Sequence, residues 1–158
     1  MHLVQSLPAS VDASLPEIAI RVDRQRLAKR RWRAAAEDGA EFGFELESPL
    51  RDGDAVWASG TARYVVRQDE EPALELSLDV NPATAATIGW TIGNLHFPVE
   101  TRGGRLLAPD DEAVRQALGR LGVPFRPVKA LFRPSTTAAP HSHGHDAHSH
   151  PGEGGHSH

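Results

Sequence analysis

The composition of the last 24 residues limits which part of this chain can fold. From Ser135 to His158 there is no large apolar residue, and seven of the nine histidines of the chain lie there. A segment of this kind cannot bury enough apolar surface to offset the entropy lost on ordering. We therefore predict a disordered His-rich tail over 135–158 and a hydrophobic core built from the residues before it.

The bulk composition narrows the class of protein. The chain of 158 residues suits one domain or two small ones, and its net charge of −4 gives no globally basic surface for nucleic acid. It contains no cysteine, which excludes disulfides, thiolate zinc sites and cysteine nucleophiles. The N-terminus lacks the pattern of a secretory signal, and no stretch approaches the roughly 18 apolar residues of a membrane span. We expect a soluble, cytoplasmic protein without membrane contact.

The first half of the chain reads as strands. Residues 1–16 contain Pro8 and Pro16 and are predicted to be a flexible N-terminus. Residues 17–70 alternate apolar and polar side chains, with turn dipeptides at Asp38-Gly39 and Asp52-Gly53. This pattern predicts a small all-β domain that ends at the charged segment QDEEP.

The second half alternates strands with helices. A strand begins near Ala73, and Asn81 and Pro82 are suited to begin a helix that ends at Gly93-Asn94. Two short strands, LHFPVE and GRLL, and a second helix with an apolar stripe follow, and PFRPVKALF closes the pattern as a strand. The order β-α-β-β-α-β predicts a ferredoxin-like domain over 71–134. The fold class is α+β.

The tail has the chemistry of a metal ligand. Neutral imidazole binds Ni(II), Cu(II), Zn(II) and Co(II), and residues two apart in an extended chain point the same way. The seven tail histidines, mostly at this spacing, are predicted ligands: His141, His143, His145, His148, His150, His156 and His158. Binding should weaken below about pH 6, as imidazoles protonate. Because the histidines are mixed with Ser, Gly, Asp, Ala, Pro and Glu, the pattern favours an encoded metal site over a purification tag or a passive solubiliser.

His96 stands alone just after the first predicted helix of the second domain, in IGNLHFPVE. A single histidine at such a junction is more often a packed or hydrogen-bonded structural residue than a ligand. One imidazole also cannot fill the coordination sphere of a metal. If His96 binds metal, the remaining ligands must come from the tail, from water or from a second copy of the chain.

Several segments together resemble one known family. GWTIGNLHFPVE resembles the Gly-Asn-x-His motif region of the UreE urease accessory nickel metallochaperones, and LRDGDAVW resembles a turn of their first domain. EAVRQALGRLGV, followed by ALFRPSTTAAPHSHGHDAHSH, is similar to their last helix, Phe-x-Pro segment and His-rich end. The resemblance extends over nearly all of 17–158.

The resemblance implies a fold and a function. It implies a peptide-binding-like first domain, a ferredoxin-like metal-binding domain, and a homodimer in which His96 meets its dimer mate to bind one nickel ion. It further implies that the tail binds additional nickel. The cargo would pass to the urease maturation complex, including its GTPase accessory protein, and the chain would not be an enzyme.

The chain also departs from the family pattern. Leu95 stands where the motif commonly has arginine, and Thr91 stands where some relatives carry a further histidine. Asp110 and Glu112 occupy the places of a His-x-His pair found in some relatives. These two acids could be weak ligands, although capping of the following helix explains them better.

Other functions were weighed against this one. The basic segment RVDRQRLAKRRWR at 21–33 could touch nucleic acid, but the acidic chain favours a solvated strand face or a surface for an acidic protein partner. A hydrolase using His96 with an acidic residue has little support. The alternative from another class is a general divalent-metal storage or detoxification protein with no dedicated client.

Overall fold

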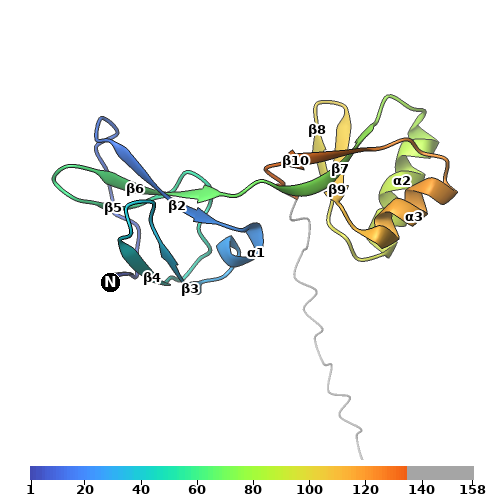
Figure 1. Cartoon of the computed structure of the whole chain (residues 1–158). Helices are drawn as coiled ribbons and strands as arrows, with labels where there is room; N and C mark the ends of the chain where they lie inside the picture. Colours follow the sequence, from blue (N-terminus) through green and yellow to red (C-terminus); the bar gives the residue numbers. More distant parts are fainter. Residues whose placement is uncertain (135–158) are drawn as a thin grey trace, which may run out of the picture.

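The computed structural model describes residues 1–134, and the predicted tail lies outside the described residues. Figure 1 shows two lobes side by side, joined where the chain passes from β6 to β7. The mixed α+β class is confirmed. The elements are β1 (His2–Val4), β2 (Glu17–Val22), α1 (Arg24–Leu27), β3 (Arg31–Ala35), β4 (Glu41–Glu45), β5 (Ala55–Ala58), β6 (Arg63–Gln68), β7 (Glu71–Ser77), α2 (Pro82–Asn94), β8 (Glu100–Arg102), β9 (Arg105–Pro109), α3 (Glu112–Arg120) and β10 (Arg126–Ala130).

The first lobe is built from two three-stranded sheets, ordered β1-β4-β3 and β2-β6-β5. β3 and β4 pair as an antiparallel hairpin around the Asp38-Gly39 turn, as the sequence predicts, and Gly39 adopts a φ of 87°. The alternating apolar residues point inward, so that Phe42, Phe44 and Leu46 all lie in the core. Burial of one face of each sheet is what stabilises this lobe.

Two details of this lobe differ from the prediction. The first residues are not loose, because His2–Val4 form β1, which pairs in parallel with β4, and Val4 is buried. The His2 ring also stacks on Phe42, with 5.1 Å between ring centroids. In addition, a helical turn, α1, interrupts the strands, capped by the Asp23 carboxylate. Elements of three or four residues are too short to show a periodic pattern.

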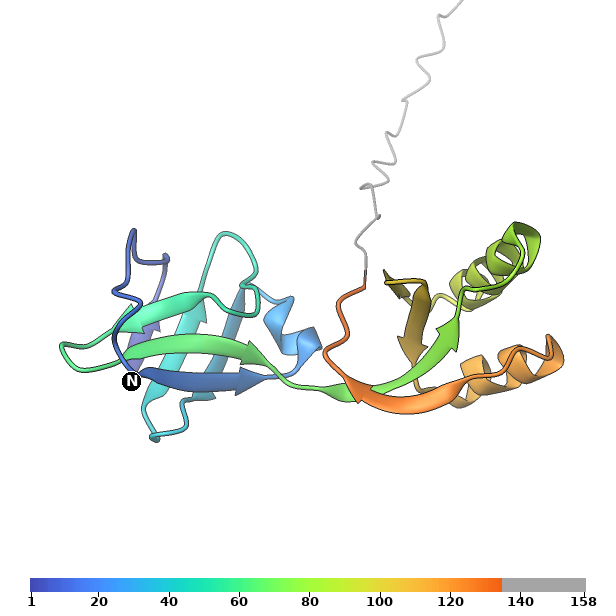
Figure 2. The ribbon, with the colours of Figure 1, turned by 90° about the horizontal axis from the view of Figure 1, so that it is seen from above.

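The second lobe has the predicted β-α-β-β-α-β order. Its sheet is ordered β10-β7-β9-β8 with every neighbour antiparallel, which is the split βαβ arrangement. α2 and α3 lie on the same side of this sheet (Figure 2), where Leu74 and Leu76 of β7 pack against Ile88 and Ile92 of α2. None of the helices among residues 1–134 has the length and apolarity that crossing a membrane requires.

The opposite face of this sheet is covered by the segment that follows β10, Leu131–Pro134, which we call the strap. Phe132 is completely buried against Ala73 of β7 and Leu107 of β9. The strap also reaches the first lobe. The Gln68 side-chain amide at the end of β6 donates to the carbonyl of Phe132 over 2.8 Å, and Arg133 pairs with Asp52 at 2.5 Å. The strap therefore touches both lobes at the point where they join.

The second lobe holds the same strap from its other side. The carboxylate of Glu100 in β8 accepts from the backbone N–H of Arg133 over 2.6 Å, and Arg102 donates to the carbonyl of Leu131 over 3.0 Å. Above the Phe132 ring lies the guanidinium of Arg24, 5.0 Å from the ring centroid, and Arg24 also pairs with Glu71 at 2.6 Å. Both lobes therefore contribute polar contacts to three consecutive residues of the strap, Leu131–Arg133.

Replacing Phe132 with alanine should lower the free energy of unfolding by about 3 kcal/mol, because a fully buried ring is lost and a cavity is left. Leu131→Ala, one residue earlier and only partly buried, should cost about 1 kcal/mol or less. Urea unfolding of both variants measures the difference. Equal losses would show that Phe132 does not carry the packing of the strap.

Candidate metal centre

The helix α2 brings His96 to the surface. Asn81 caps its first turn, as predicted, with its side-chain oxygen accepting from the N–H of Thr84 over 2.9 Å. One face of α2 carries Ile88 and Ile92, which are completely buried against the sheet. The burial of this face fixes the rotation of α2 about its axis. The position of the residues at the end of α2 is therefore fixed as well.

At the end of α2, His96 occupies a backbone position that usually holds glycine. The N–H of His96 donates to the carbonyl of Gly93 over 2.9 Å, and that of Phe97 to Ile92 over 3.4 Å. This pair of bonds forms a Schellman motif, in which the residue at the His96 position takes left-handed backbone. His96 has a φ of 63°, the only positive φ of a non-glycine residue in the stretch 1–134.

The Schellman motif sets the directions of the side chains that follow α2. Phe97 and Val99 turn back onto the core of the second lobe, as the hydrophobic contact of a Schellman motif usually does. His96 points away from that core and is exposed. The prediction that LHFPVE forms a short strand is therefore wrong for its first part, since β8 begins only at Glu100. Leu95, His96 and Phe97, which precede this strand, instead form the capped end of α2.

The His96 imidazole makes no hydrogen bond to any residue between 1 and 134, so the structure does not use it as a polar anchor of the fold. Within the same residues, no three His, Asp or Glu side chains lie close enough together to hold a metal ion. A metal ion bound at His96 would therefore need further ligands from water, from the tail or from another molecule. The seven predicted tail ligands, from His141 to His158, lie outside the described residues.

The surface beside His96 is free of charge. None of the thirteen residues of α2 is charged, and the exposed side includes Trp90, 70% of which is accessible. Gly93 also lies on this side, and a Cβ added there would meet no atom within 4 Å. An exposed tryptophan on a neutral helix face is typical of a surface that another protein covers.

The three acidic residues at the start of α3, Asp110, Asp111 and Glu112, form hydrogen bonds within this helix and its first turn. Both oxygens of Asp110 accept from Arg115, at 2.6 and 2.8 Å, and this hydrogen bonding holds the pKa of Asp110 below its usual range. Asp111 caps the helix through the N–H of Ala113, and Glu112 accepts from Gln116. Asp110 and Glu112, for which the sequence favoured a capping role, are thus engaged with side chains of α3, whereas the residue that caps the helix is Asp111.

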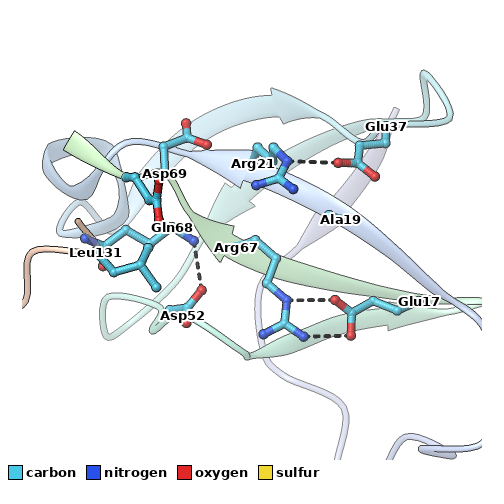
Figure 3. Close-up of a pocket in the computed structure, with 10 residues that line it drawn as sticks. Glu17, Ala19, Arg21, Glu37, Asp52, Arg67, Gln68, Asp69 and Leu131 are labelled. Atoms are coloured by element: carbon cyan, nitrogen blue, oxygen red, sulfur yellow. Dashed lines mark hydrogen bonds and ion pairs between the residues drawn. The ribbon is translucent and has the colours of Figure 1, made fainter. Parts of the chain in front are cut away.

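A hollow of about 830 Å³ lies in the first lobe, over β2 and β6 (Figure 3). Its charged side chains largely pair with each other: Arg21 with Glu37 at 2.9 Å, and Arg67 with Glu17 through two hydrogen bonds of 2.7 and 2.8 Å. The pKa of Glu17 is lowered chiefly by its bond to Arg67. No local pattern in the sequence predicts this hollow, because its lining comes from segments far apart in the chain.

Replacing His96 with glycine should raise the free energy of unfolding by about 0.5–1 kcal/mol, because glycine adopts left-handed backbone without steric cost. His96→Ala should bring no such gain, since alanine keeps the Cβ. Thermal and urea unfolding without metal compares the three proteins. A glycine variant no more stable than the alanine variant would show that the backbone at this position is not strained.

The chain was compared with known proteins. The model of the UreE urease accessory protein C-terminal domain matches residues 71–158. A protein of Burkholderia ambifaria called urease accessory protein UreE is 32% identical over 145 residues, covering 89% of this chain and 70% of that protein. A protein of the same name from a Chelativorans species is 30% identical, covering 92% of this chain and 90% of that protein. A family model matches more than half of the length of this chain, and its UreE relatives are named accessory proteins and not enzymes, so the chain belongs to the UreE family of urease accessory proteins.

Proposed function

We propose that this protein is a nickel metallochaperone that binds Ni(II) as a homodimer and delivers it, in the cytoplasm, during maturation of urease. The observation that carries the proposal is the exposed His96 imidazole, which is held in left-handed backbone at the end of an uncharged helix and makes no contact that the fold needs. Unfavourable backbone geometry that persists without a structural benefit is typical of functional positions.

The isolated position of His96 supports a site shared between two copies. One imidazole does not fill the coordination sphere of a divalent ion, and no other ligand cluster lies among residues 1–134. A two-fold axis beside α2 would place a second His96 opposite the first. Such a site keeps positions open for water or for tail histidines, so that the ion can be exchanged, as delivery requires.

The surface of α2 supports the same assembly. Interfaces between proteins are depleted of charge at their centre and enriched in tryptophan, and the exposed face of α2 has both properties. The absence of a side chain at Gly93 lets a facing backbone approach closely. In a two-fold interface the same patch meets itself, so a neutral face avoids repulsion between like charges.

The tail is proposed to collect nickel and to pass it to the His96 site. Its histidines number seven, so a dimer would carry fourteen of these imidazoles in addition to the two of His96. The ion would then go to the urease maturation complex, with the GTPase accessory protein as the direct partner. This client separates a chaperone from a storage protein, which would bind metal equally well but hand it to no partner.

Nickel titration by calorimetry should distinguish the two sets of ligands. The full chain should bind several ions per dimer, and a truncation after Pro140 should keep one tight ion per dimer. Adding His96→Ala to the truncation should abolish that tight ion, because no other described ligand cluster remains. A truncation that binds no ion tightly would contradict the shared site and favour the storage function.

Trp90→Glu should weaken dimerisation at least about tenfold, because truncating a buried interface tryptophan often costs about 2 kcal/mol or more and the new charge adds desolvation. Leu121→Glu is the matched control, since Leu121 is also exposed, at 40%, but lies at the end of α3. Sedimentation without metal measures both variants. A dimer that survives Trp90→Glu would move the interface away from α2.

A further inference from the structure

Six of the seventeen Lys and Arg residues lie between Arg24 and Arg33, in a chain with a net charge of −4. The proposed metal delivery makes no use of this segment. Its backbone is held firmly: Leu27 is buried, the carbonyl of Arg30 accepts from Leu46 over 2.9 Å, and the Trp32 ring stacks on Phe44 at 4.0 Å. The apolar side chains of the segment therefore point inward and most of its cations point outward.

Three of these cations have no ionic partner in the described part of the chain. Lys29, Arg30 and Arg33 are exposed and form no ion pair with any residue from 1 to 134. Arg31 pairs with Glu45 at 2.8 Å, but its side chain is 80% exposed. Ion pairs as exposed as this one contribute little and can rearrange. The cations are thus available to a ligand from outside.

A groove runs beside them. Its volume is about 920 Å³, and it is lined by Ala28–Arg31 and by Glu45–Glu47 with Pro49. A second hollow of about 310 Å³ continues from it over the outer face of the β1-β4-β3 sheet, and both hollows share Arg31 and Glu45. The apolar side chains of Met1 and Leu3 line this continuation. The combined surface, which we call the basic groove, offers cations next to apolar atoms.

The spacing of the cations fits an extended chain. Arg31 and Arg33 lie two residues apart on β3, so their side chains emerge on the same face about 7 Å apart. Alternate residues of an extended peptide have the same spacing. β3 is also the last strand in the order of its sheet, so a segment can lie along it without displacing a neighbouring strand of that sheet.

We propose that the basic groove docks an extended acidic segment of a partner protein, with alternate carboxylates on Lys29–Arg33. Nucleic acid fits less well, because its phosphates form an unbroken line of charge and Glu45 and Glu47 in the lining of the groove would repel part of it. Carboxylates at intervals of two residues can avoid those acids. Charge complementarity of this kind speeds association and selects the partner.

The test uses the full chain with a chelator at neutral pH, so that bound metal cannot attract carboxylates. The probe is a fluorescent peptide of alternating glutamate and alanine, followed by anisotropy at low ionic strength. Reversing Lys29, Arg30 and Arg33 to glutamate should weaken binding about tenfold or more, and added salt should weaken the wild type. The neutral changes Lys29→Gln, Arg30→Gln and Arg33→Gln should cause a smaller loss.

The matched control reverses one lysine and two arginines elsewhere, Arg51, Arg120 and Lys129, which are also exposed and form no ion pair with the described residues. It should change peptide binding less than twofold. Equal losses in both triple variants would show an effect of net charge alone and overturn the proposal. So would single-stranded DNA that binds the wild type more tightly than the peptide. Nickel titration of the variants should be unchanged, because this proposal does not depend on the proposed metal delivery.

Discussion

The whole arrangement depends on how the strap, Leu131–Pro134, is held where the lobes meet. Only two polar residues are buried among residues 1–134, Gln68 and Glu100, and each one binds the backbone of the strap. Gln68 comes from the first lobe and Glu100 from the second. A buried polar group is costly unless it is hydrogen-bonded, so each side chain would lose a buried hydrogen bond if the strap left this position. The orientation of the lobes and the position of the strap are therefore linked, and the chain leaves the described structure from a fixed point beside this joint.

Much of the fold could be predicted because its signals are local and repeated. The βαββαβ order followed from strand alternation, from the cap at Asn81 and from the apolar stripe of α3, and the hairpin followed from Asp38-Gly39. The features that could not be predicted were either very short elements or contacts between residues far apart in the sequence. β1 and α1 have three and four residues, below the length at which a period can be recognised. The seating of Phe132 joins residues that are far apart in sequence, and no local pattern reports such a contact.

The candidate site was also predictable only in part. The sequence, through a family resemblance, singled out His96, and the structure adds why this position differs from an ordinary helix end. The Schellman motif there favours glycine or asparagine, and a histidine in its left-handed position forgoes some stability. Sequence periodicity cannot show this, because φ is set by the two hydrogen bonds to Gly93 and Ile92. Those bonds also aim the imidazole outward, since Phe97 has to return to the core.

The two surfaces argued for here lie on different lobes and differ in kind. The face of α2 is neutral and suited to a copy of itself, whereas the basic groove is charged and suited to an acidic chain. Neither surface includes a residue of the strap, so occupying one does not require the joint to open. A partner held by the first lobe would leave His96 accessible. Because the strap fixes the lobes relative to each other, that partner would also be held in a defined orientation toward the proposed metal site at His96, and this orientation would favour direct transfer of an ion over its release into solution.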